Sequence, residues 1–383
     1  MQTVTDNDPG SAMTDKAKLR DPSKILRAIG LMSGTSMDGI DVALIESDGK
    51  RVPMRGPHAT YPYRKSLRAR LKLQAGQAPQ PGPALEELVR DVTDAHAEAV
   101  EDFSARAGID LGEVDLIGFH GQTVFHDPKA AMTCQLGDSG RLAGRLGVPV
   151  VNDFRSADVA AGGEGAPFAP LYHAALAASL DLPVCILNMG GVGNLTWIST
   201  DGAVIAFDTG PANAMLDDWV SEKTGGDMDE GGQISRNGQV NDAALKALLT
   251  NAYFTATFPK SLDRDHFDRS PINDLTLEDG AATLVRFSAA AVAKGQALLP
   301  APPLKWLVTG GGRHNPVLMA ALREELGRPV EPVEAVDWHG DALEAQAFAF
   351  LAVRSVRGLA LSLPTTTGVP EPLTGGVLSF PTQ

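Results

Sequence analysis

The chain has 383 residues, of which 43% are apolar and 21% are charged. This length exceeds the roughly 250–300 residues at which a single hydrophobic core usually stops growing, so we expect a globular protein of two domains. The chain has 33 basic and 47 acidic residues, a net charge of −14, and only 5% aromatic residues, which argues against a surface for nucleic acid or anionic membranes and favours a small-molecule ligand.

The cysteines and the N-terminus bear on the cellular compartment. Cys134 and Cys185 are the two cysteines of the chain, too few for a disulfide framework or a thiolate metal site, which fits a reducing cytoplasm. The first residues are polar and lack the apolar segment of a secretory signal, so we expect residues 1–24 to form a flexible extension. A charge-free run at 182–197 contains asparagines and glycines and is typical of strand, turn and strand rather than of a membrane span. We therefore expect a cytoplasmic protein.

The first predicted elements are two strands joined by a glycine-rich turn. Residues 25–32 are mostly apolar, residues 33–39 are polar and contain glycine, and residues 40–46 alternate between apolar and polar side chains. This pattern predicts a β-hairpin. Apolar residues at helical spacing between Leu85 and Phe103 then predict a surface helix that stops at a glycine.

Short buried strands are predicted at 116–119 and 148–151, because each of these apolar runs ends in polar or glycine residues. The residues that follow them include His120 and Asp153, which makes both candidate site residues.

The second half of the chain begins with another strand, glycine turn and strand at 184–198, followed by a strand at 203–207. Helical spacing of apolar residues predicts further helices at 212–223, 242–253, 276–299, 316–326 and 342–354. A strand at 306–309 separates the third of these helices from the fourth. Strands that alternate with helices predict an α/β fold.

The strand, glycine turn and strand pattern occurs once in each half, which predicts two related lobes facing a cleft. We place the first lobe at 25–180 and the second at 181–383, and leave open that the final helices pack back on the first lobe.

Three glycine-rich turns follow apolar strands, at 33–39, 188–194 and 309–313. Glycine lets backbone N–H groups converge on an anion, and serine and threonine add hydroxyl donors, so phosphate is the expected ligand. Each turn alone is also compatible with a tight hairpin. Neither a Walker A motif nor a strand–GxGxxG–helix fingerprint is present, which disfavours the two common nucleotide-binding folds.

Five segments of the chain together resemble the anhydro-N-acetylmuramic acid kinase family. They are Gly30 to Asp41, Gly118 to Thr123, Asn152 to Pro167, Phe207 to Pro211 and Val308 to Gly312. The resemblance runs from about Ile25 to the C-terminus. The family belongs to the superfamily of acetate and sugar kinases, actin and heat-shock chaperones, so the resemblance implies a two-lobed actin-like or sugar-kinase ATPase fold.

The resemblance also implies an activity. An enzyme of this family uses ATP to open the 1,6-anhydro bridge of anhydro-N-acetylmuramic acid and leaves the 6-phosphate, which is a step of peptidoglycan recycling. The expected ligands are therefore ATP, Mg²⁺ and a small amino sugar, without nucleic acid or membrane, and a homodimer is left open. Magnesium is expected because it neutralises charge on the phosphate oxygens. Asp38 and Asp41 are the carboxylates nearest to the first turn, but the spacing assigns no metal ligand.

Site residues follow from the same resemblance and from the glycine turns. Asp208 and Glu344 are implied as catalytic carboxylates, and His120, Arg155 and Asp158 as residues that line the sugar pocket. The candidate nucleotide contacts are Gly34, Thr35, Ser36, Met37, Asp38, Gly39, Ile40, Asp41, Gly190, Gly191, Gly310, Gly311 and Gly312.

The chain departs from the family pattern beside these residues. Ala212 stands where Gly is common, and Glu164 stands where Gln is usual. Both departures bear on substrate affinity more than on the class of reaction.

The two carboxylates each have a structural alternative. Asp208 ends a strand, where a carboxylate could deprotonate the water that attacks the anomeric carbon, or it could cap the helix predicted from residue 212. Glu344 follows Asp341 at the spacing of a capping box and could instead satisfy backbone donors.

The candidate sugar-binding residues also have alternatives. His120 and Gln122 could form a satisfied network at the end of a strand. Arg155 could pair with Asp153 or Asp158, or its guanidinium could bind the lactyl carboxylate that distinguishes muramic acid from glucosamine.

Two other functions remain to be distinguished. A conventional hexose or amino-sugar kinase would phosphorylate a hydroxyl without adding water. A non-enzymatic actin-like nucleotide switch would hydrolyse ATP slowly and without stimulation by sugar.

Overall fold

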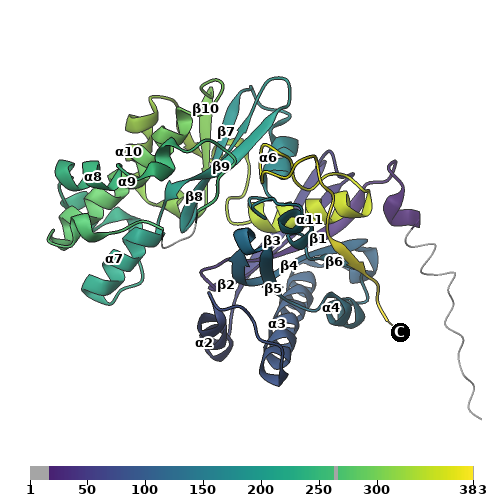
Figure 1. Cartoon of the computed structure of the whole chain (residues 1–383). Helices are drawn as coiled ribbons and strands as arrows, with labels where there is room; N and C mark the ends of the chain where they lie inside the picture. The colour runs from purple at the N-terminus through teal and green to yellow at the C-terminus, as the bar shows by residue number, and fades with distance from the viewer. Residues whose placement is uncertain (1–16, 263–265, 383) are drawn as a thin grey trace, which may run out of the picture. The chain divides into compact units, whose positions relative to one another are not determined.

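The computed structural model describes residues 17–262 and 266–382 (Figure 1), so residues 1–16 of the expected extension lie outside the described residues. The chain divides into two compact units. Unit 1 consists of Met1–Gly165, Glu344–Leu363 and Val369–Gln383, and unit 2 consists of Ala166–Leu343 and Pro364–Gly368. The chain passes from unit 1 to unit 2 after Gly165, ahead of the boundary expected near residue 180, and its C-terminal part returns to unit 1.

Unit 1 contains a seven-stranded sheet in the order β12-β6-β4-β1-β2-β3, with β5 paired to β4. Neighbours β1, β2 and β3 are antiparallel, whereas β4 is parallel to both β1 and β6. The strands are β1 (Leu26–Ser33), β2 (Gly39–Ser47), β3 (Met54–Pro62), β4 (Leu116–Asp127), β5 (Met132–Leu136), β6 (Val150–Asn152) and β12 (Val377–Ser379).

Unit 2 contains a five-stranded sheet in the order β11-β10-β7-β8-β9. Neighbours β7, β8 and β9 are antiparallel, as β1, β2 and β3 are in unit 1. Strand β10 is parallel to both β7 and β11, as β4 is to β1 and β6. The strands are β7 (Val184–Met189), β8 (Val192–Ile198), β9 (Val204–Pro211), β10 (Lys305–Thr309) and β11 (Val330–Pro332). The two sheets therefore share one strand order, and the predicted α/β fold with two related halves is confirmed.

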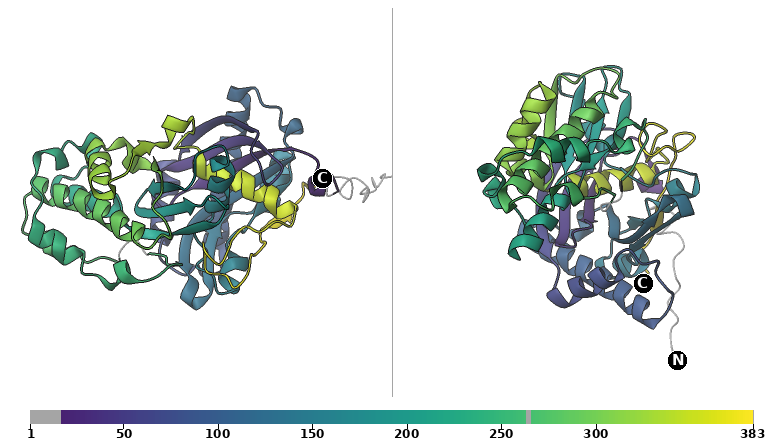
Figure 2. Two further views of the ribbon diagram at one scale, coloured as in Figure 1. Left: turned by 90° about the horizontal axis from the view of Figure 1, so that it is seen from above. Right: turned by 60° about the vertical axis from the view of Figure 1, so that its left-hand side comes forward.

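Helices cover both faces of the sheet in unit 1. Ile29 and Leu31 of β1 belong to a buried cluster with Val92 and Val100 of the long helix α3. Successive side chains of a strand point to opposite faces, so Gly30 faces the other side, where it meets the helix α11 (Figures 1 and 2). The helices of this unit are α2 (Lys65–Gln74), α3 (Pro83–Ala107), α4 (Ser139–Leu146), α5 (Ser156–Ala160) and α11 (Leu343–Val356).

The contact between α11 and the sheet depends on two glycines. Gly30 of β1 and Gly118 of β4 lie side by side in the parallel register. A Cβ atom at Gly30 would lie 1.8 Å from the carbonyl oxygen of Ala345, and one at Gly118 would lie 2.1 Å from that of Phe348. Only glycine lets the helix backbone approach this closely. The pair thus fixes where the first turn of α11 lies on the sheet of unit 1.

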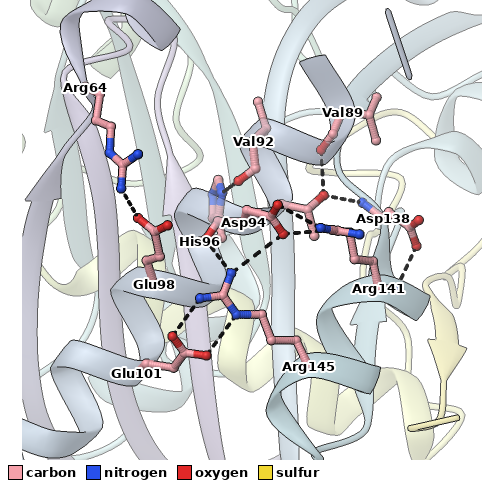
Figure 3. Close-up of polar contacts among 11 residues, drawn as sticks. Arg64, Val89, Val92, Asp94, His96, Glu98, Glu101, Asp138, Arg141 and Arg145 are labelled. Carbon is pink, nitrogen blue, oxygen red and sulfur yellow. Dashed lines mark hydrogen bonds and ion pairs between the residues drawn. The ribbon is translucent and has the colours of Figure 1, made fainter. Parts of the chain in front are cut away.

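Ion pairs join α3 to α4 (Figure 3). Arg141 binds Asp94 through Nε and Nη2, both at 2.8 Å, and Arg145 binds Glu101 at 2.9 and 2.7 Å. Each exposed pair contributes little to stability, but two bidentate forks fix the orientation of α4. Because β6 follows α4, this orientation also directs the segment that carries Arg155.

In unit 2, α9 packs on one face of the sheet and α6 on the other. Phe287 and Val292 of α9 share a buried cluster with Leu195 and Trp197 of β8. Thr196 lies between these two strand residues and faces the other side, where its hydroxyl oxygen lies 2.9 Å from Nδ1 of His173 in α6. The helices are α6 (Pro170–Ala177), α7 (Ala214–Thr224), α8 (Asp242–Leu248), α9 (Leu277–Gln296) and α10 (Pro316–Leu326). The helix predicted at 242–253 is too long: α8 ends at Leu248, and Asn251 caps a separate short turn at Ala252–Thr255.

The edge strand β9 of this sheet has its outer side bonded to two irregular segments. The Ala206 N–H donates to the Thr365 carbonyl at 3.0 Å, and the Asp208 N–H donates to the Lys260 carbonyl at 3.1 Å. Backbone groups that an edge strand would leave open are thereby satisfied. Asp208 is consequently fixed at its backbone although it lies near the end of an edge strand.

Candidate active site

In the first glycine turn two hydroxyl side chains are exposed and the side chain of Met37 is buried. The Met37 N–H donates to the Gly34 carbonyl at 3.1 Å, and Met37 has a φ of 55° with its side chain 3% exposed. Thr35 and Ser36 are exposed. Gly34 has open space, since a Cβ there would find no atom nearer than the Ser36 Oγ at 3.9 Å. The turn thus offers an unobstructed backbone and two hydroxyls, which suits an anion.

The carboxylates beside this turn have protein partners. Asp38 forms an ion pair with Arg68, and Asp41 accepts a hydrogen bond from the Thr60 hydroxyl at 2.6 Å. Within residues 17–262 and 266–382, no group of three or more histidine, cysteine, aspartate or glutamate side chains is arranged to hold a metal ion. A metal brought by a nucleotide would therefore depend on phosphate oxygens for much of its coordination.

The second and third glycine turns lie together in unit 2. A Cβ at Gly310 would lie 2.3 Å from the Asn188 side-chain oxygen, and one at Gly312 would lie 2.7 Å from the Met189 Cβ. The carbonyl of Gly190 accepts from Asn213 at the start of α7. Parallel pairing of β7 with β10 explains this meeting, because it aligns the ends of both strands. The predicted helix start after the third turn is confirmed, with Asn315 as N-cap and Pro316 as first residue.

His120 and Arg155 are in direct contact in unit 1. The Arg155 Nε and Nη2 lie 3.1 and 3.0 Å from the His120 Nε2, and the His120 Nδ1 lies 2.8 Å from the Gly121 carbonyl. Burial and the Arg155 charge hold the pKa of His120 well below its ordinary value. The imidazole is therefore neutral, with a proton on Nδ1 and an acceptor at Nε2.

Arg155 and Asp158 both hold the loop that ends at Gly165. The Arg155 Nη1 donates to the Gly165 carbonyl, and the Gly165 N–H donates to the Asp158 carboxylate at 2.7 Å. Asp158 is only 1% exposed, so its observed contacts are with protein. Burial lowers the pKa of Arg155 to about 10, an effect that Glu344 and Asp158 oppose, and the guanidinium stays charged near neutral pH.

Glu344 lies in the first turn of α11, in the same unit as this pair. Its side chain reaches solvent. The surrounding protein raises its pKa, the Asp41 carboxylate adds to the rise, and Arg155 opposes it. The capping partner suggested by the sequence, Asp341, forms an ion pair with Arg313 at 2.8 Å, and α11 begins at Leu343. Unit 1 thus gathers four of the predicted site residues, His120, Arg155, Asp158 and Glu344, whereas Asp208 belongs to unit 2.

Asp208 does not cap the helix that follows it. Helix α7 begins at Ala214 with Asn213 as its N-cap, whereas Asp208 lies within β9 and is half-buried. Its carboxylate accepts from the Leu262 N–H at 2.8 Å, and its carbonyl accepts from the Tyr253 hydroxyl at 2.6 Å. The alternative that Asp208 caps the following helix is therefore wrong. Asp208 is instead a strand residue whose carboxylate is held in one orientation.

Sequence reasoning missed the residues that hold these groups. Tyr253 contacts Asp208 from the short turn Ala252–Thr255, and Lys260 and Leu262 contact it from the irregular segment that follows. No motif marks these three residues. The only signal was composition: aromatic and proline residues are concentrated at 253–259 in a chain otherwise poor in aromatics. No helix among the residues described by the structure is long and apolar enough to cross a membrane.

Several known proteins are similar to this chain. Among solved structures, a ROK family glucokinase from Streptomyces griseus in complex with glucose and AMPPNP is 16% identical with a TM-score of 0.38, and the match covers 85% of this chain and 99% of that one. Anhydro-N-acetylmuramic acid kinase of Paramagnetospirillum magneticum is 54% identical over 353 residues, which cover 91% of this chain and 98% of the relative. The corresponding protein of Rhodospirillum rubrum is 53% identical over 360 residues, 94% and 95% of the two chains. Residues 26–381 match the family model for anhydro-N-acetylmuramic acid kinase, and the chain therefore belongs to this family.

Proposed function

We propose that this protein is a sugar kinase that uses ATP to convert 1,6-anhydro-N-acetylmuramic acid into N-acetylmuramic acid 6-phosphate. The observation that carries the proposal is the family match over residues 26–381, together with relatives of about the same length that carry this name. A conventional sugar kinase and a nucleotide switch are not favoured by these relatives.

The reaction couples two displacements, one at the anomeric carbon and one at the γ-phosphorus. The oxygen of a water molecule bonds to the anomeric carbon while the bond from that carbon to the bridging oxygen breaks. The bridging oxygen remains on C6 and bonds to the γ-phosphorus, and ADP leaves. The water loses a proton, so the enzyme needs a base near the anomeric carbon, a role worth roughly 10²–10⁴ in rate.

Asp208 is our candidate for that base. The Leu262 N–H holds the carboxylate in one orientation, and a carboxylate held in this way can orient and deprotonate a water molecule. The residue is half-buried within the edge strand β9, where a base can be reached by substrate and still be held rigidly. Glu344 is our second catalytic carboxylate, proposed from its place in the first turn of α11, in the same unit as His120 and Arg155.

The neutral His120 and the charged Arg155 are proposed to bind the sugar. Arg155 offers the one cation of this cluster, which suits the lactyl carboxylate. Asp158 supports them indirectly, because it is buried and bonded to the loop at Gly165. The departure at Glu164 lies in this loop, where the Glu164 carbonyl accepts from His126 at 2.9 Å, so the loop backbone is held whichever side chain stands there.

ATP phosphates are proposed to bind at the glycine turns, Gly34–Asp41 in unit 1 and Gly190, Gly191 and Gly310–Gly312 in unit 2. Mg²⁺ prefers carboxylate oxygens, and Asp38 and Asp41 are the carboxylates beside the first turn. Because Asp38 pairs with Arg68 and Asp41 accepts from Thr60, phosphate oxygens would supply much of the coordination of an ion bound there. When bound, the ion neutralises charge on the phosphate oxygens.

The test is a sugar-dependent assay in water enriched in oxygen-18. Purified full-length protein with ATP and magnesium should release ADP only when the anhydro sugar is added, and the product should carry one labelled oxygen at the anomeric carbon. Unlabelled 6-phosphate product incubated for the same time measures spontaneous exchange at that carbon. Label no greater than this background, or equal activity on N-acetylmuramic acid without the anhydro bridge, would favour a conventional kinase. ADP release that ignores the sugar would favour the nucleotide switch.

A further inference from the structure

The segment 253–262, which we call the brace, binds Asp208 at three separate atoms. The Tyr253 hydroxyl donates to the Asp208 carbonyl at 2.6 Å, the Asp208 N–H donates to the Lys260 carbonyl at 3.1 Å, and the Leu262 N–H donates to the carboxylate at 2.8 Å. Both the backbone and the side chain of Asp208 are therefore held by one short stretch of chain. Any change in the shape of the brace would move the carboxylate.

The side chain of Lys260 holds the brace closed. Its Nζ donates to the Tyr253 carbonyl at 2.9 Å, which joins the two ends of the brace. The ammonium also lies 4.4 Å from the centroid of the Tyr253 ring and 5.5 Å from that of Phe207, the residue before Asp208 in β9. A cation over aromatic faces is stabilised by their quadrupoles. The ammonium is thus fixed between the brace and the strand that carries Asp208.

Lys260 also interacts electrostatically with Asp208. Burial lowers the pKa of Lys260 to about 8, and the Asp208 carboxylate acts in the opposite direction by favouring the charged ammonium. The same attraction acts on Asp208 and favours its ionised form. A general base must be ionised before it can accept a proton.

We propose, on the basis of the role given above to Asp208, that Lys260 is a positioning residue for the reaction: its ammonium holds the brace against β9, and its positive charge interacts with the Asp208 carboxylate. Lys260 does not contact the reacting atoms in this proposal. It acts through Asp208, so its contribution depends on that carboxylate being present.

The experiment compares four test variants and one control variant of the full-length protein in the sugar-dependent ADP-release assay. Lys260→Met removes the charge and keeps most of the side-chain length, whereas Lys260→Arg keeps the charge. Asp208→Asn and the double variant Lys260→Met with Asp208→Asn test the dependence on the carboxylate. Lys246→Met on α8 is the matched control, because Lys246 is exposed.

We expect Lys260→Met to lower kcat by roughly 10- to 100-fold, the size of effect that misplacement of a catalytic group produces, with the KM for ATP changed by less than about twofold. Lys260→Arg should recover most of kcat, and Lys246→Met should resemble the parent. In the Asp208→Asn background, Lys260→Met should have little further effect, because positioning through Asp208 is already lost.

A purely structural role would lower the thermal midpoint and kcat alike in both Lys260 variants. Tyr253→Phe is a second probe, because it removes only the hydroxyl that binds the Asp208 carbonyl and should reduce kcat in the same direction. Normal kcat in Lys260→Met, or a full additional loss in the Asp208→Asn background, would overturn the proposal while Asp208 remained the base. Normal kcat in Asp208→Asn would instead overturn the base assignment on which the proposal depends.

Discussion

The hydroxyl of Ser33 lies 2.6 Å from the side-chain oxygen of Gln122, and these side chains are 1% and 0% exposed. The amide nitrogen of Gln122 donates to the carbonyls of Gly34 and Thr123, each at 3.1 Å. Ser33 ends β1, Gly34 begins the first glycine turn, and Gln122 lies in β4. This buried pair therefore fixes the start of the turn to the neighbouring strand.

Gln122→Leu should loosen the first turn without altering its exposed residues. The substitution leaves the Ser33 hydroxyl and the Gly34 carbonyl without these partners, at a cost of about 1–3 kcal/mol. We expect a lower thermal midpoint and a KM for ATP raised by roughly tenfold, with kcat less affected. The exposed Gln77 donates to a helix carbonyl at 3.0 Å, and Gln77→Leu is the control. If the Gln122→Leu variant is destabilised but its KM for ATP is unchanged, the Ser33–Gln122 pair contributes to folding and not to nucleotide binding.

Gly34→Val tests the turn itself. A Cβ atom at Gly34 would have no neighbour nearer than 3.9 Å, so the variant should fold with an unchanged thermal midpoint. A branched side chain should still keep phosphate away from the backbone N–H groups, and the KM for ATP should rise by at least about tenfold. Gly34→Ala should give a smaller rise. Unchanged ATP kinetics in both variants would remove this turn from the nucleotide site.

The hairpins and most helices could be predicted because their signals are local. Apolar or alternating runs of residues on either side of a glycine turn predict both hairpins. Short apolar runs predict the strands that pair in parallel. The packing of α11 on unit 1 depends instead on Gly30 and Gly118 becoming neighbours, which requires the parallel register of β1 and β4. Pairing between distant strands is not encoded in any short window of sequence.

In the candidate site, too, some features have local sequence signals and others depend on contacts between distant segments. Motifs marked the glycine turns and Asp208, but the strand expected to end before Asp208 continues to Pro211. Local spacing also suggested a helix cap for Asp208, and the position of α7 excludes it. The strand expected to end before His120 continues to Asp127, and the contact between His120 and Arg155 arises because β4 pairs in parallel with β6, after which Arg155 follows. Lys260 could not be found from sequence, because an irregular segment reaches Asp208 through the free edge of β9.

Arg155→Lys should weaken sugar binding selectively. Lysine keeps the charge but cannot reproduce the guanidinium fork, so the KM for the anhydro sugar should rise by roughly tenfold while that for ATP stays the same. The control is 1,6-anhydro-N-acetylglucosamine, which lacks the lactyl carboxylate and should lose less. Equal losses with both sugars would mean that Arg155 acts through His120 and the loop at Gly165.

Acid should destabilise the protein through His96. This residue is fully buried, lies 4.9 Å from the Phe119 ring, and burial lowers its pKa to about 4. The unfolded chain binds a proton near pH 6.5 and the folded chain does not, so stability is lost as pH falls from about 6.5 towards 4, by up to about 1.4 kcal/mol per pH unit.

His96→Phe should retain the ring packing and remove this titration. Its thermal midpoint should fall less between pH 7 and pH 5 than that of the parent. His173 in unit 2, with a pKa that burial lowers to about 3, should still contribute to the remaining fall. His314→Gln is the control, because His314 is exposed. Identical pH dependence in His96→Phe and the parent would show that His96 does not titrate on unfolding in this range.

Asp208, which is half-buried, and Asp158, which is buried, should affect different kinetic constants. Asp208→Asn keeps an oxygen that can accept from the Leu262 N–H but cannot accept a proton from water, so kcat should fall by roughly 10²–10⁴ with little change in the KM for ATP. Asp158→Asn should act mainly on the KM for the sugar, because Asp158 is 1% exposed and holds the loop at Gly165. Steady-state kinetics of both variants, with each substrate varied in turn, makes the comparison. Normal turnover in Asp208→Asn with lost turnover in Asp158→Asn would exchange the two roles, and normal turnover in both would leave the attacking water without its base.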